Sequence, residues 1–436
     1  YEAELFAITQ LAINPATNAP YEYRPSAPTY PKFSYIDDIT DNNSAQSFVV
    51  RDKSDVELDG SGYDLGFLWF IPYGTETSFQ FYVMGVYPNS PAAKAGLTRG
   101  AIINEVNGQK IGSNYNNQRA LVYDIVNADP SSVTISGVKA DGTAFTKVTL
   151  TKVKYQSSPV YKAKTITTGS KKIGYMAFAR FSELKKTAKA DLDKVFTDFA
   201  SDGVTDLIID LRYNGGGYVE TAEYLTNLIV PSTVTGVMFK EFHNETMQAN
   251  KATILKHQPL LDENDKLQFQ GADTVTYADL DYSLAANTRS FSKKGSLGTV
   301  KNIVFIVTGN TASASELVIN SLKPHMNVKL VGSTTYGKPV GFFPIRLENK
   351  YDVFMSMFET KNSLNEGGYY AGMAPDVADN NRNIFDDAMF DFGDEEEAYL
   401  SAAITSLAPA TSGATSSRSV MSIRGKQMST SSALGL

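Results

Sequence analysis

A serine in a turn of small residues, and a lysine that follows it, are the side chains best suited to chemistry in this chain. Ser313 lies in the run Thr311–Glu316, and Lys338 follows it by 25 residues. A serine hydroxyl attacks an amide carbonyl only when a base takes its proton and donors stabilise the oxyanion. The two residues therefore indicate a serine nucleophile with a lysine as its general base.

Lysine is a better candidate for this base than histidine. The chain has only three histidines, none in a turn of small residues, and it has no Gly-x-Ser-x-Gly sequence. A lysine becomes a usable base when burial among apolar groups lowers its pKa from about 10.4. Tyr336, Val340 and Phe342 lie close to Lys338 and predict such a setting.

Backbone amides are the expected oxyanion donors. Ala314 follows the serine and supplies one amide, and the run Gly215–Gly217 supplies the other, because glycine lets a backbone approach a ligand closely. Asn214 is expected to shape that turn. An alternative interpretation also fits Ser313, since Ser313 and Glu316 have the spacing of a capping box that begins a helix.

The neighbouring segments predict how these residues are positioned. The apolar β-branched run Asn302–Val307 is typical of a strand, and Leu317–Leu322 suits a buried helix face. The serine therefore lies where a strand turns into a helix, beside free amides. A second strand, Val328–Val331, leads toward the lysine. The strand Asp206–Leu211, apolar enough to be buried on both faces, leads into the glycine run.

Other segments of this region alternate between strand and helix, which indicates an α/β layered core. A strand is predicted over Lys172–Phe178, with helices over Ser182–Ala200 and Val219–Ile229. Residues 240–296 interrupt the alternation, and we interpret them as an insertion that covers one side of the site. A helix with an acidic first turn is predicted over Asp394–Leu407.

Residues 55–155 predict a small β-rich domain. The expected elements are a strand at Phe81–Val86, a turn and short helix at Ser90–Leu97, a strand at 101–109, a helix at Asn117–Ala128 and two strands within 132–152. Residues 1–54 are rich in Pro, Asn and Asp and read as a loosely structured lead-in or partial domain. Residues 408–436 are rich in Ser, Thr and Ala and predict a flexible tail.

The composition limits the classes of function. The chain has 436 residues, of which 42% are hydrophobic, and its net charge is −7, which argues against a nucleic-acid partner. The absence of cysteine excludes disulfides, thiol nucleophiles and thiolate metal sites. No apolar run reaches 18 residues, so no membrane span is expected. The chain begins at Tyr1 without a visible signal peptide, and we expect it to be processed or trimmed.

The run Asp210–Gly217, the run Thr311–Glu316 and Gly337-Lys338, in this order after the small domain, resemble the C-terminal-processing (tail-specific) serine peptidases with a PDZ domain. The resemblance covers roughly residues 60–408. It implies a mixed α/β fold: a PDZ-like β-rich domain followed by an α/β-layered peptidase core of the ClpP/crotonase-like type over residues 156–407.

By this resemblance, Ser313 rather than Ser315 corresponds to the nucleophile, Lys338 to the general base, and Ala314 and Gly216 to the oxyanion donors. The sequence departs from the family at two nearby positions. Phe342 stands where a glutamine often orients the lysine, and Pro339 stands where glycine is commoner. The resemblance implies no metal and no cofactor.

The resemblance also implies a peptide site in the PDZ-like domain. Leu65, Gly66 and Phe67 would hold the C-terminal carboxylate of a polypeptide substrate through their amides. Asp64 precedes them where the family usually has glycine. An alternative is a PDZ-like fold that serves only as a spacer or lid.

The expected function is therefore a serine endopeptidase that cleaves polypeptides near their C-terminus with a Ser–Lys dyad. The resemblance implies an exported location: periplasmic, cell-surface or secreted. The alternative is a non-hydrolytic peptide- or apolar-ligand-binding protein on the same scaffold. The Phe342 departure favours this second possibility.

Overall fold

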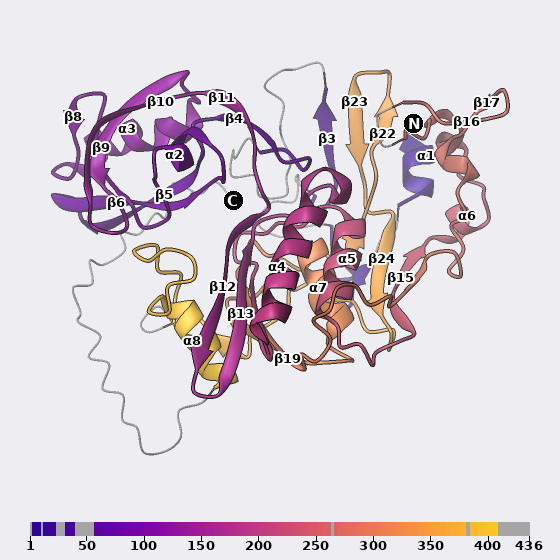
Figure 1. Ribbon diagram of the computed structural model, residues 1–436. Helices are drawn as coiled ribbons and strands as arrows, with labels where there is room; N and C mark the ends of the chain where they lie inside the picture. The colour runs from indigo at the N-terminus through magenta and orange to yellow at the C-terminus, as the bar shows by residue number, and fades with distance from the viewer. Residues whose placement is uncertain are drawn as a thin grey trace.

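The computed structural model describes residues 2–9, 12–22, 31–39, 56–262, 266–380 and 384–408. Helices and strands are both abundant, so the predicted mixed α/β class is confirmed. Figure 1 shows a β-rich group of elements, in purple, beside a larger layered core that runs from magenta to yellow. None of the described helices has the length and apolar character needed to cross a lipid bilayer.

A six-stranded sheet forms the centre of the core, in the order β12-β13-β14-β19-β20-β25. Neighbouring strands from β13 to β25 pair in parallel, and β12 pairs with β13 antiparallel. The strands span Val160–Thr168 (β12), Lys171–Phe178 (β13), Asp206–Asp210 (β14), Asn302–Val307 (β19), Asn327–Gly332 (β20) and Val377–Ala378 (β25). Parallel pairing brings the carboxyl ends of β14, β19 and β20 to one edge of the sheet.

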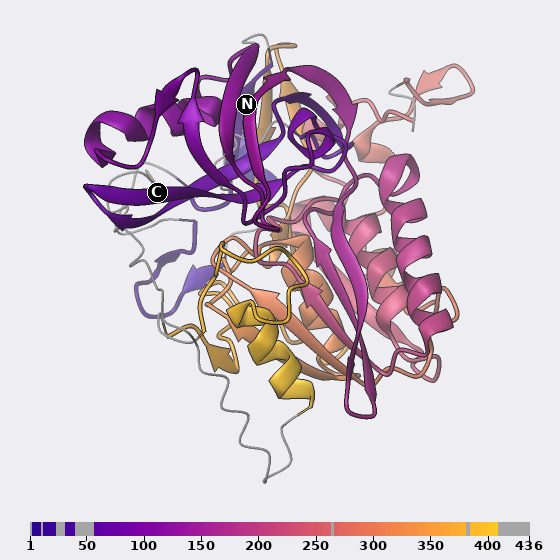
Figure 2. The ribbon, with the colours of Figure 1, turned by 60° about the vertical axis from the view of Figure 1, so that its left-hand side comes forward.

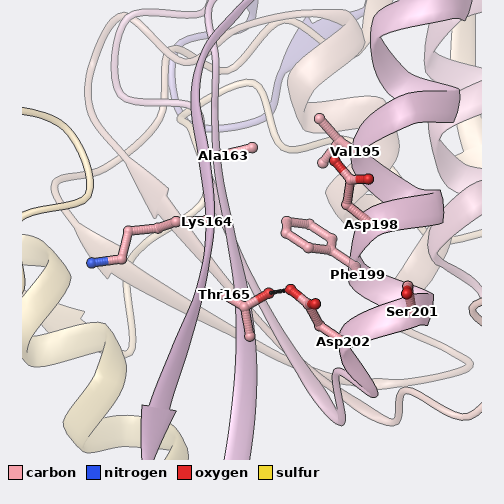
Figure 3. A pocket seen from close by; sticks show the side chains of 8 residues that line it. All are labelled: Ala163, Lys164, Thr165, Val195, Asp198, Phe199, Ser201 and Asp202. Atoms are coloured by element: carbon pink, nitrogen blue, oxygen red, sulfur yellow. Dashed lines mark hydrogen bonds between the residues drawn. The ribbon is translucent and has the colours of Figure 1, made fainter.

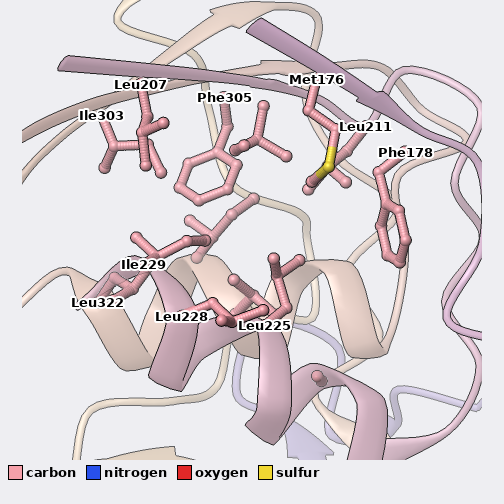
Figure 4. Close-up of a cluster of buried hydrophobic side chains, with 14 of the residues drawn as sticks. Met176, Phe178, Leu207, Leu211, Leu225, Leu228, Ile229, Ile303, Phe305 and Leu322 are labelled. Atoms are coloured by element: carbon pink, nitrogen blue, oxygen red, sulfur yellow. The ribbon is translucent and has the colours of Figure 1, made fainter. Parts of the chain in front are cut away.

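Helices cover both faces of this sheet, as Figures 1 and 2 show. The helices on one face are α4 (Lys189–Asp202), extended at its start by the π-turn η1 (Leu184–Ala188), α5 (Val219–Ile229) and α7 (Ala314–Leu322); α8 (Ala398–Leu407) packs on the other. Figure 4 shows Leu207 and Phe305 of the sheet facing Leu225 and Ile229 of α5. Ile208 points to the opposite face, toward α8. This burial on both sides explains the continuous apolar runs of the strands.

The β-rich group forms a separate sheet in the order β10-β9-β7-β6-β5, with β8 beside β7 and a β4–β11 pair apart from it. Its elements are β4 (Ser61–Asp64), β5 (Phe67–Thr75), β6 (Ser78–Val86), α2 (Pro91–Lys94), β7 (Ile102–Val106), β8 (Gln109–Lys110), α3 (Tyr115–Asn127), β9 (Ser132–Val138), β10 (Ala144–Thr151) and β11 (Val153–Gln156). Ser90 begins α2 by accepting from the Ala93 N–H, with Pro91 at the first helical position. The predicted succession of strands and helices is confirmed here.

The remaining strands form smaller sheets beside the core. One has the order β18-β15-β24-β21 and another the order β22-β23-β3. Their strands are β15 (Val237–His243), β18 (Thr288–Ser290), β21 (Val340–Gly341), β24 (Phe358–Asn362), β22 (Ile345–Leu347), β23 (Tyr351–Phe354) and β3 (Tyr35–Asp38). The predicted insertion 240–296 thus begins inside β15. It contains α6 (Glu245–Gln248), two 3₁₀ turns (Thr253–His257 and Tyr277–Asp279) and the hairpin β16 (Phe269–Gln270) and β17 (Asp273–Thr274).

The prediction of a loosely structured lead-in is wrong for the described N-terminal residues. They form α1 (Glu2–Ala7), β1 (Ile13–Asn14), β2 (Ala19–Pro20) and β3, and β3 pairs with β23 of the core. Ile8 and Phe33 are buried in hydrophobic clusters of the core. Composition misled the prediction, because long-range pairing orders these residues.

The helix predicted over Asp394–Leu407 begins later than expected. Helix α8 starts at Ala398, and Glu397 caps it by accepting from the Leu400 N–H at 2.9 Å. The acidic residues before Glu397 lie in turns. The prediction of a tail from residue 408 falls, from residue 409 onward, outside the described residues.

Candidate active site

Ser313 lies in a strained turn between β19 and α7. Its backbone has φ 54° and ψ −115°, in the left-handed region that a serine rarely adopts. Such a conformation costs about 1–3 kcal/mol and persists only where neighbours hold it. Here the Ala312 N–H donates to the Asn214 oxygen at 3.1 Å, and the Glu316 carboxylate accepts from the Ser313 N–H at 3.0 Å. A strained strand-to-helix turn is a geometry that presents a nucleophile.

Glu316 joins the serine turn to the lysine turn. Its fully buried carboxylate accepts from the Ser313 N–H, from the Gly337 N–H at 2.7 Å and from the Lys338 N–H at 2.8 Å. The Thr335 hydroxyl donates to it at 2.5 Å. Burial raises the pKa of Glu316, and these hydrogen bonds act in the opposite direction. The sequence showed Glu316 only as a capping residue, whereas here it holds two turns together.

Lys338 is buried, as the sequence predicts, with 3% of its surface exposed. Its Nζ lies 4.0 Å from the centre of the Phe342 ring. Burial lowers the pKa of Lys338 to about 7, although Glu22 and Glu316 act to raise it. The amine is therefore neutral in a large share of molecules near neutral pH, as a general base requires. The aromatic ring occupies the place of the expected glutamine and favours the charged form.

Residues of the N-terminal segment contact the turn that carries Lys338. Lys32 donates from Nζ to the Gly337 oxygen at 3.3 Å and to the Tyr370 oxygen at 2.6 Å. The Tyr336 hydroxyl donates to the Lys32 oxygen at 2.8 Å. The residues on both sides of the lysine turn are thus tied to a segment some 300 positions earlier in the chain.

Glu22 is a buried carboxylate of the same N-terminal segment. It accepts from the Phe33 N–H at 2.8 Å, from the Ser356 hydroxyl at 3.0 Å and from the Ser34 hydroxyl. Its charge acts on Lys338. Sequence reasoning missed Glu22, because no local pattern links it to a lysine so far along the chain.

Gly216 lies against the serine turn. Its φ is +107°, and a Cβ placed on it would lie 2.8 Å from the Ser313 Cβ and 3.1 Å from the Ala314 nitrogen. The predicted oxyanion residues are therefore brought together. The Gly216 N–H, however, donates to Asn214 Oδ1 at 2.9 Å. The Ala314 N–H is the first amide of α7 and therefore has no acceptor within the helix, which leaves it able to donate to a ligand.

Asn214 shapes the glycine turn, as predicted. It donates from Nδ2 to the Phe178 oxygen at 2.9 Å and accepts from Gly216, and its own carbonyl accepts from Ser315 Oγ at 2.9 Å. Ser315 is therefore a buried structural residue. Among the described contacts, no hydrogen bond joins the Ser313 hydroxyl to the Lys338 amine.

Arg212 anchors the base of the glycine turn. It pairs with Asp210 and with Glu397, both at 2.8 Å. It also pairs with Asp386 at 2.8 Å, and Asp386 pairs with Arg99 of the β-rich group at 2.6 Å. Although burial acts to raise it, the two guanidinium groups lower the pKa of Asp386 to about 2.

The predicted peptide-binding residues also lie together. Leu65, Gly66 and Phe67 line a small cavity between the start of β5 and the end of α3. A second, larger hollow of about 310 Å³ lies between β12 and α4, away from the serine and lysine turns. Figure 3 shows its lining residues, which are Ala163, Lys164, Thr165, Val195, Asp198, Phe199, Ser201 and Asp202.

Comparisons with known families agree with this geometry. Residues 172–378 match the model of peptidase family S41, and residues 82–124 match a PDZ domain model. The S41 match holds the glycine, serine and lysine turns, and the PDZ match lies within the β-rich group, which we call the PDZ domain from here on.

Two bacterial proteases are similar to this chain. It is 24% identical over 312 residues to a carboxy-terminal-processing protease of Bartonella bacilliformis, covering 71% of this chain and 57% of the relative. It is 24% identical over 301 residues to a CtpA-like serine protease of Staphylococcus aureus, covering 68% and 50%. The chain thus spans about half the length of the curated relatives it matches.

A solved structure shares the fold. The crystal structure of an S41 protease from Bacteroides fragilis NCTC 9343 aligns with a TM-score of 0.61 and 22% identity, covering 87% of each chain. The predicted architecture of a PDZ-like domain with an α/β peptidase core is thereby confirmed.

Proposed function

We propose that this chain is a serine endopeptidase in which Ser313 is the nucleophile and Lys338 the general base. The observation that supports the proposal is the Glu316 carboxylate, which accepts hydrogen bonds from the backbone N–H groups of both residues and so joins the strained serine turn to the turn that carries the buried lysine. The printed name of the Bartonella bacilliformis relative, a carboxy-terminal-processing protease, extends the proposal to polypeptide substrates cleaved near their C-terminus.

The chemistry would proceed in two stages. The neutral Lys338 amine takes the Ser313 hydroxyl proton as the oxygen attacks the scissile carbonyl carbon, and the resulting ammonium protonates the leaving amine when the C–N bond breaks. Water then attacks the serine ester while Lys338 accepts its proton; the ester C–O bond breaks, Lys338 returns the proton to the Ser313 oxygen, and the product leaves with its new carboxyl group. The Ala314 and Gly216 amides would donate to the oxyanion in both stages.

The Gly216 amide must change partner for this role. Its N–H donates to Asn214 Oδ1. A bound carbonyl that develops negative charge is a stronger acceptor than a neutral side-chain amide, so it would attract the Gly216 N–H. Completion of the oxyanion site would thus follow substrate binding, and it requires only a local adjustment of residues 214–216.

Two substitutions test the proposal. Ser313→Ala and Lys338→Ala should each lower the cleavage of an unfolded protein with an apolar C-terminal tail by at least about a thousandfold, since each removes half of the dyad. Lys329→Ala, which removes an exposed lysine of β20, is the matched control and should cleave normally. Full cleavage by either site variant would end the proposal.

A non-hydrolytic ligand-binding protein on the same scaffold is the second candidate. It is favoured by the engaged Gly216 amide and by Phe342 in place of the orienting glutamine. A fluorophosphonate probe separates the two functions, because it labels only an activated serine. Labelling of Ser313 that disappears in Lys338→Ala would support the enzyme, and an unlabelled native chain would support the binding protein.

The proposal also covers the role of the PDZ domain and the location of the protein. We take the PDZ domain to contact the polypeptide substrate, and we take the protein to be exported, as its resemblance to C-terminal-processing peptidases implies. Immunoblotting of cell fractions for the native protein tests the location, and recovery in the cytosolic fraction alone would reject it.

A further inference from the structure

The cavity between β5 and α3 has walls of mixed character. Apolar residues make up most of its lining, together with two carboxylates. Its lining residues are Asp64, Leu65, Gly66, Phe67, Ile125, Val126 and Asp129.

The loop that borders this cavity is held in one shape. The Leu65 oxygen accepts from the Ala92 N–H at 3.0 Å, and the Gly66 oxygen accepts from the Tyr87 N–H at 2.9 Å. Gly66 has φ +96°, and a Cβ placed on it would lie 2.0 Å from Ser90 Oγ, so no other residue fits there without movement. The chemistry of the cavity is therefore set before a ligand arrives.

Asp64 is an incompletely satisfied carboxylate in this loop. Only 8% of its surface is exposed. Its Oδ1 accepts from the Tyr155 hydroxyl at 2.7 Å, whereas Oδ2 is buried and has no hydrogen-bond partner among the described residues. Burial raises the pKa of Asp64, and the hydrogen bond from Tyr155 acts to lower it. A buried acceptor without a donor is costly, and a ligand that donates to it removes that cost.

The second carboxylate at the cavity is already compensated. Asp129 forms an ion pair with Lys152. Asp64 is therefore the group whose charge a ligand would meet. A free C-terminal carboxylate in this cavity would face a like charge at close range, which disfavours binding, whereas an N–H or ammonium group would be attracted.

The neighbouring sheet edge fits an extended chain. β5 is the edge strand of the PDZ sheet, and within the described residues no strand pairs with its free side. An added strand would bond to this edge and place alternate side chains toward α3. Trp69 of β5 stacks on Tyr123 of α3 next to the cavity, with ring centroids 5.3 Å apart.

We infer that this cavity and the adjoining free edge of β5 bind an internal extended segment of a polypeptide, with a donor group of that segment facing Asp64. We also infer that they reject a free C-terminal carboxylate. The inference rests on the proposed function only in taking a polypeptide as the ligand. Asp64 is then the residue that makes the site prefer internal segments over free C-termini. This mode of binding replaces the predicted capture of a C-terminal carboxylate by Leu65, Gly66 and Phe67.

Matched peptide pools test this inference. The full chain carrying Ser313→Ala is immobilised at pH 7.5 and exposed to ten-residue peptides of random sequence, made once as free acids and once as C-terminal amides. Mass spectrometry of the retained peptides should show at least tenfold greater retention of the amides. Greater or equal retention of the acids, or retention of neither pool, would overturn the inference.

Two variants in the same background separate Asp64 from the general charge of the protein. Asp64→Asn keeps an acceptor for Tyr155 but removes the charge, so the preference for amides should fall below about threefold. Asp124→Asn removes an exposed carboxylate of α3 and should leave the preference intact. The assay has no turnover, so failure of the proposed catalysis would appear only in cleavage assays and would leave this result unaffected.

Discussion

Burial of Lys338 lowers its pKa and also lowers the stability of the folded protein. An amine with 3% exposure loses its hydration, and the contact with the Phe342 ring replaces only part of it. The lowered pKa of Lys338 is the result, so the folded state binds its proton less tightly than the unfolded state does. The protein is therefore expected to be less stable for carrying this residue, as is common for active-site groups.

Lys338→Met should stabilise the fold, because it fills the same space without a buried amine. The folded pKa of about 7 lies below the value of about 10.4 for the unfolded chain, so the destabilisation by Lys338 is full below pH 7 and declines toward pH 10. The gain in melting temperature should thus be larger at pH 6 than at pH 9. Lys329→Met is the exposed control. A gain that grows with pH would contradict this account.

Glu22→Gln should move the pH dependence of cleavage. The Glu22 carboxylate acts to raise the pKa of Lys338, so its neutralisation should lower that pKa. The acid limb of the kcat/KM profile would then shift to lower pH by about 0.5–1 unit, while the rate at high pH changes little. The glutamine keeps an acceptor oxygen for the Phe33 N–H, and the Ser356 hydroxyl can accept from the new side-chain amide instead of donating. An unchanged pH profile in a folded variant would show that Glu22 only makes structural hydrogen bonds and does not influence the pKa of Lys338.

At the scale of elements, the site is the contact between two turns at the end of the sheet. Gly216→Ala tests this contact, because the added methyl would meet the Ser313 Cβ at 2.8 Å and the backbone has a φ of +107°. Cleavage should fall by at least about a hundredfold, because the change would displace the proposed nucleophile and the proposed oxyanion donor. Thermal unfolding would measure the accompanying loss of stability.

Gly203→Ala is the matched control for this prediction. Gly203 ends α4 with a φ of +73°, and a Cβ there would meet nothing within 4 Å. The variant carries a similar backbone strain without the steric contact, which should cost about 1 kcal/mol of stability and leave cleavage unchanged. Equal losses of cleavage in both variants would mean that strain, rather than the contact with Ser313, explains the effect.

Much of the core could be predicted because local and global preferences agree. The strand Asn302–Val307 and the helix Val219–Ile229 have the predicted bounds, since both are apolar segments with clear starts and ends. The start of α8 was predicted too early, because the dipole rule does not reveal that Glu397 is needed by Arg212. β3 was missed, because its partner β23 lies more than 300 positions away.

The candidate site likewise contains residues that a local sequence pattern predicts and residues that only contacts between distant segments reveal. Ser313, Lys338, Ala314 and Gly216 could be named because each stands in a distinctive local sequence. The second role of Glu316 and the presence of Glu22 depend on hydrogen bonds between distant segments, which a single sequence does not encode visibly. The sequence shows Asp64 only as a departure from the family pattern, because the burial of its unpartnered oxygen depends on the fold.

At the scale of the whole molecule, one arginine connects the PDZ domain to the base of the glycine turn. Arg99 is buried, pairs with Asp386 at 2.6 Å and donates to the Tyr213 hydroxyl at 2.7 Å and to the Phe390 oxygen at 3.0 Å. Tyr213 directly precedes Asn214. The position of the PDZ domain is therefore linked to the residues that present the Gly216 amide.

Arg99→Met should weaken both stability and cleavage. Loss of one guanidinium leaves Asp386 with Arg212 as its cationic partner, and breaking a buried ion pair from one side costs about 3–5 kcal/mol. We expect a lower melting temperature and a cleavage rate at least tenfold lower, because the Tyr213 side chain loses its donor. Arg119→Met, on α3 of the same domain, should change neither by much.

A double variant decides whether the ion pair itself is responsible. Asp386→Asn combined with Arg99→Met removes both charges, so the double variant should be more stable than the sum of the two single losses predicts. Cleavage should stay low, because the Tyr213 hydroxyl would still lack the Arg99 donor that fixes it beside the glycine turn. Strictly additive losses of stability, together with normal cleavage, would show that the PDZ domain is attached to the core without influencing its site.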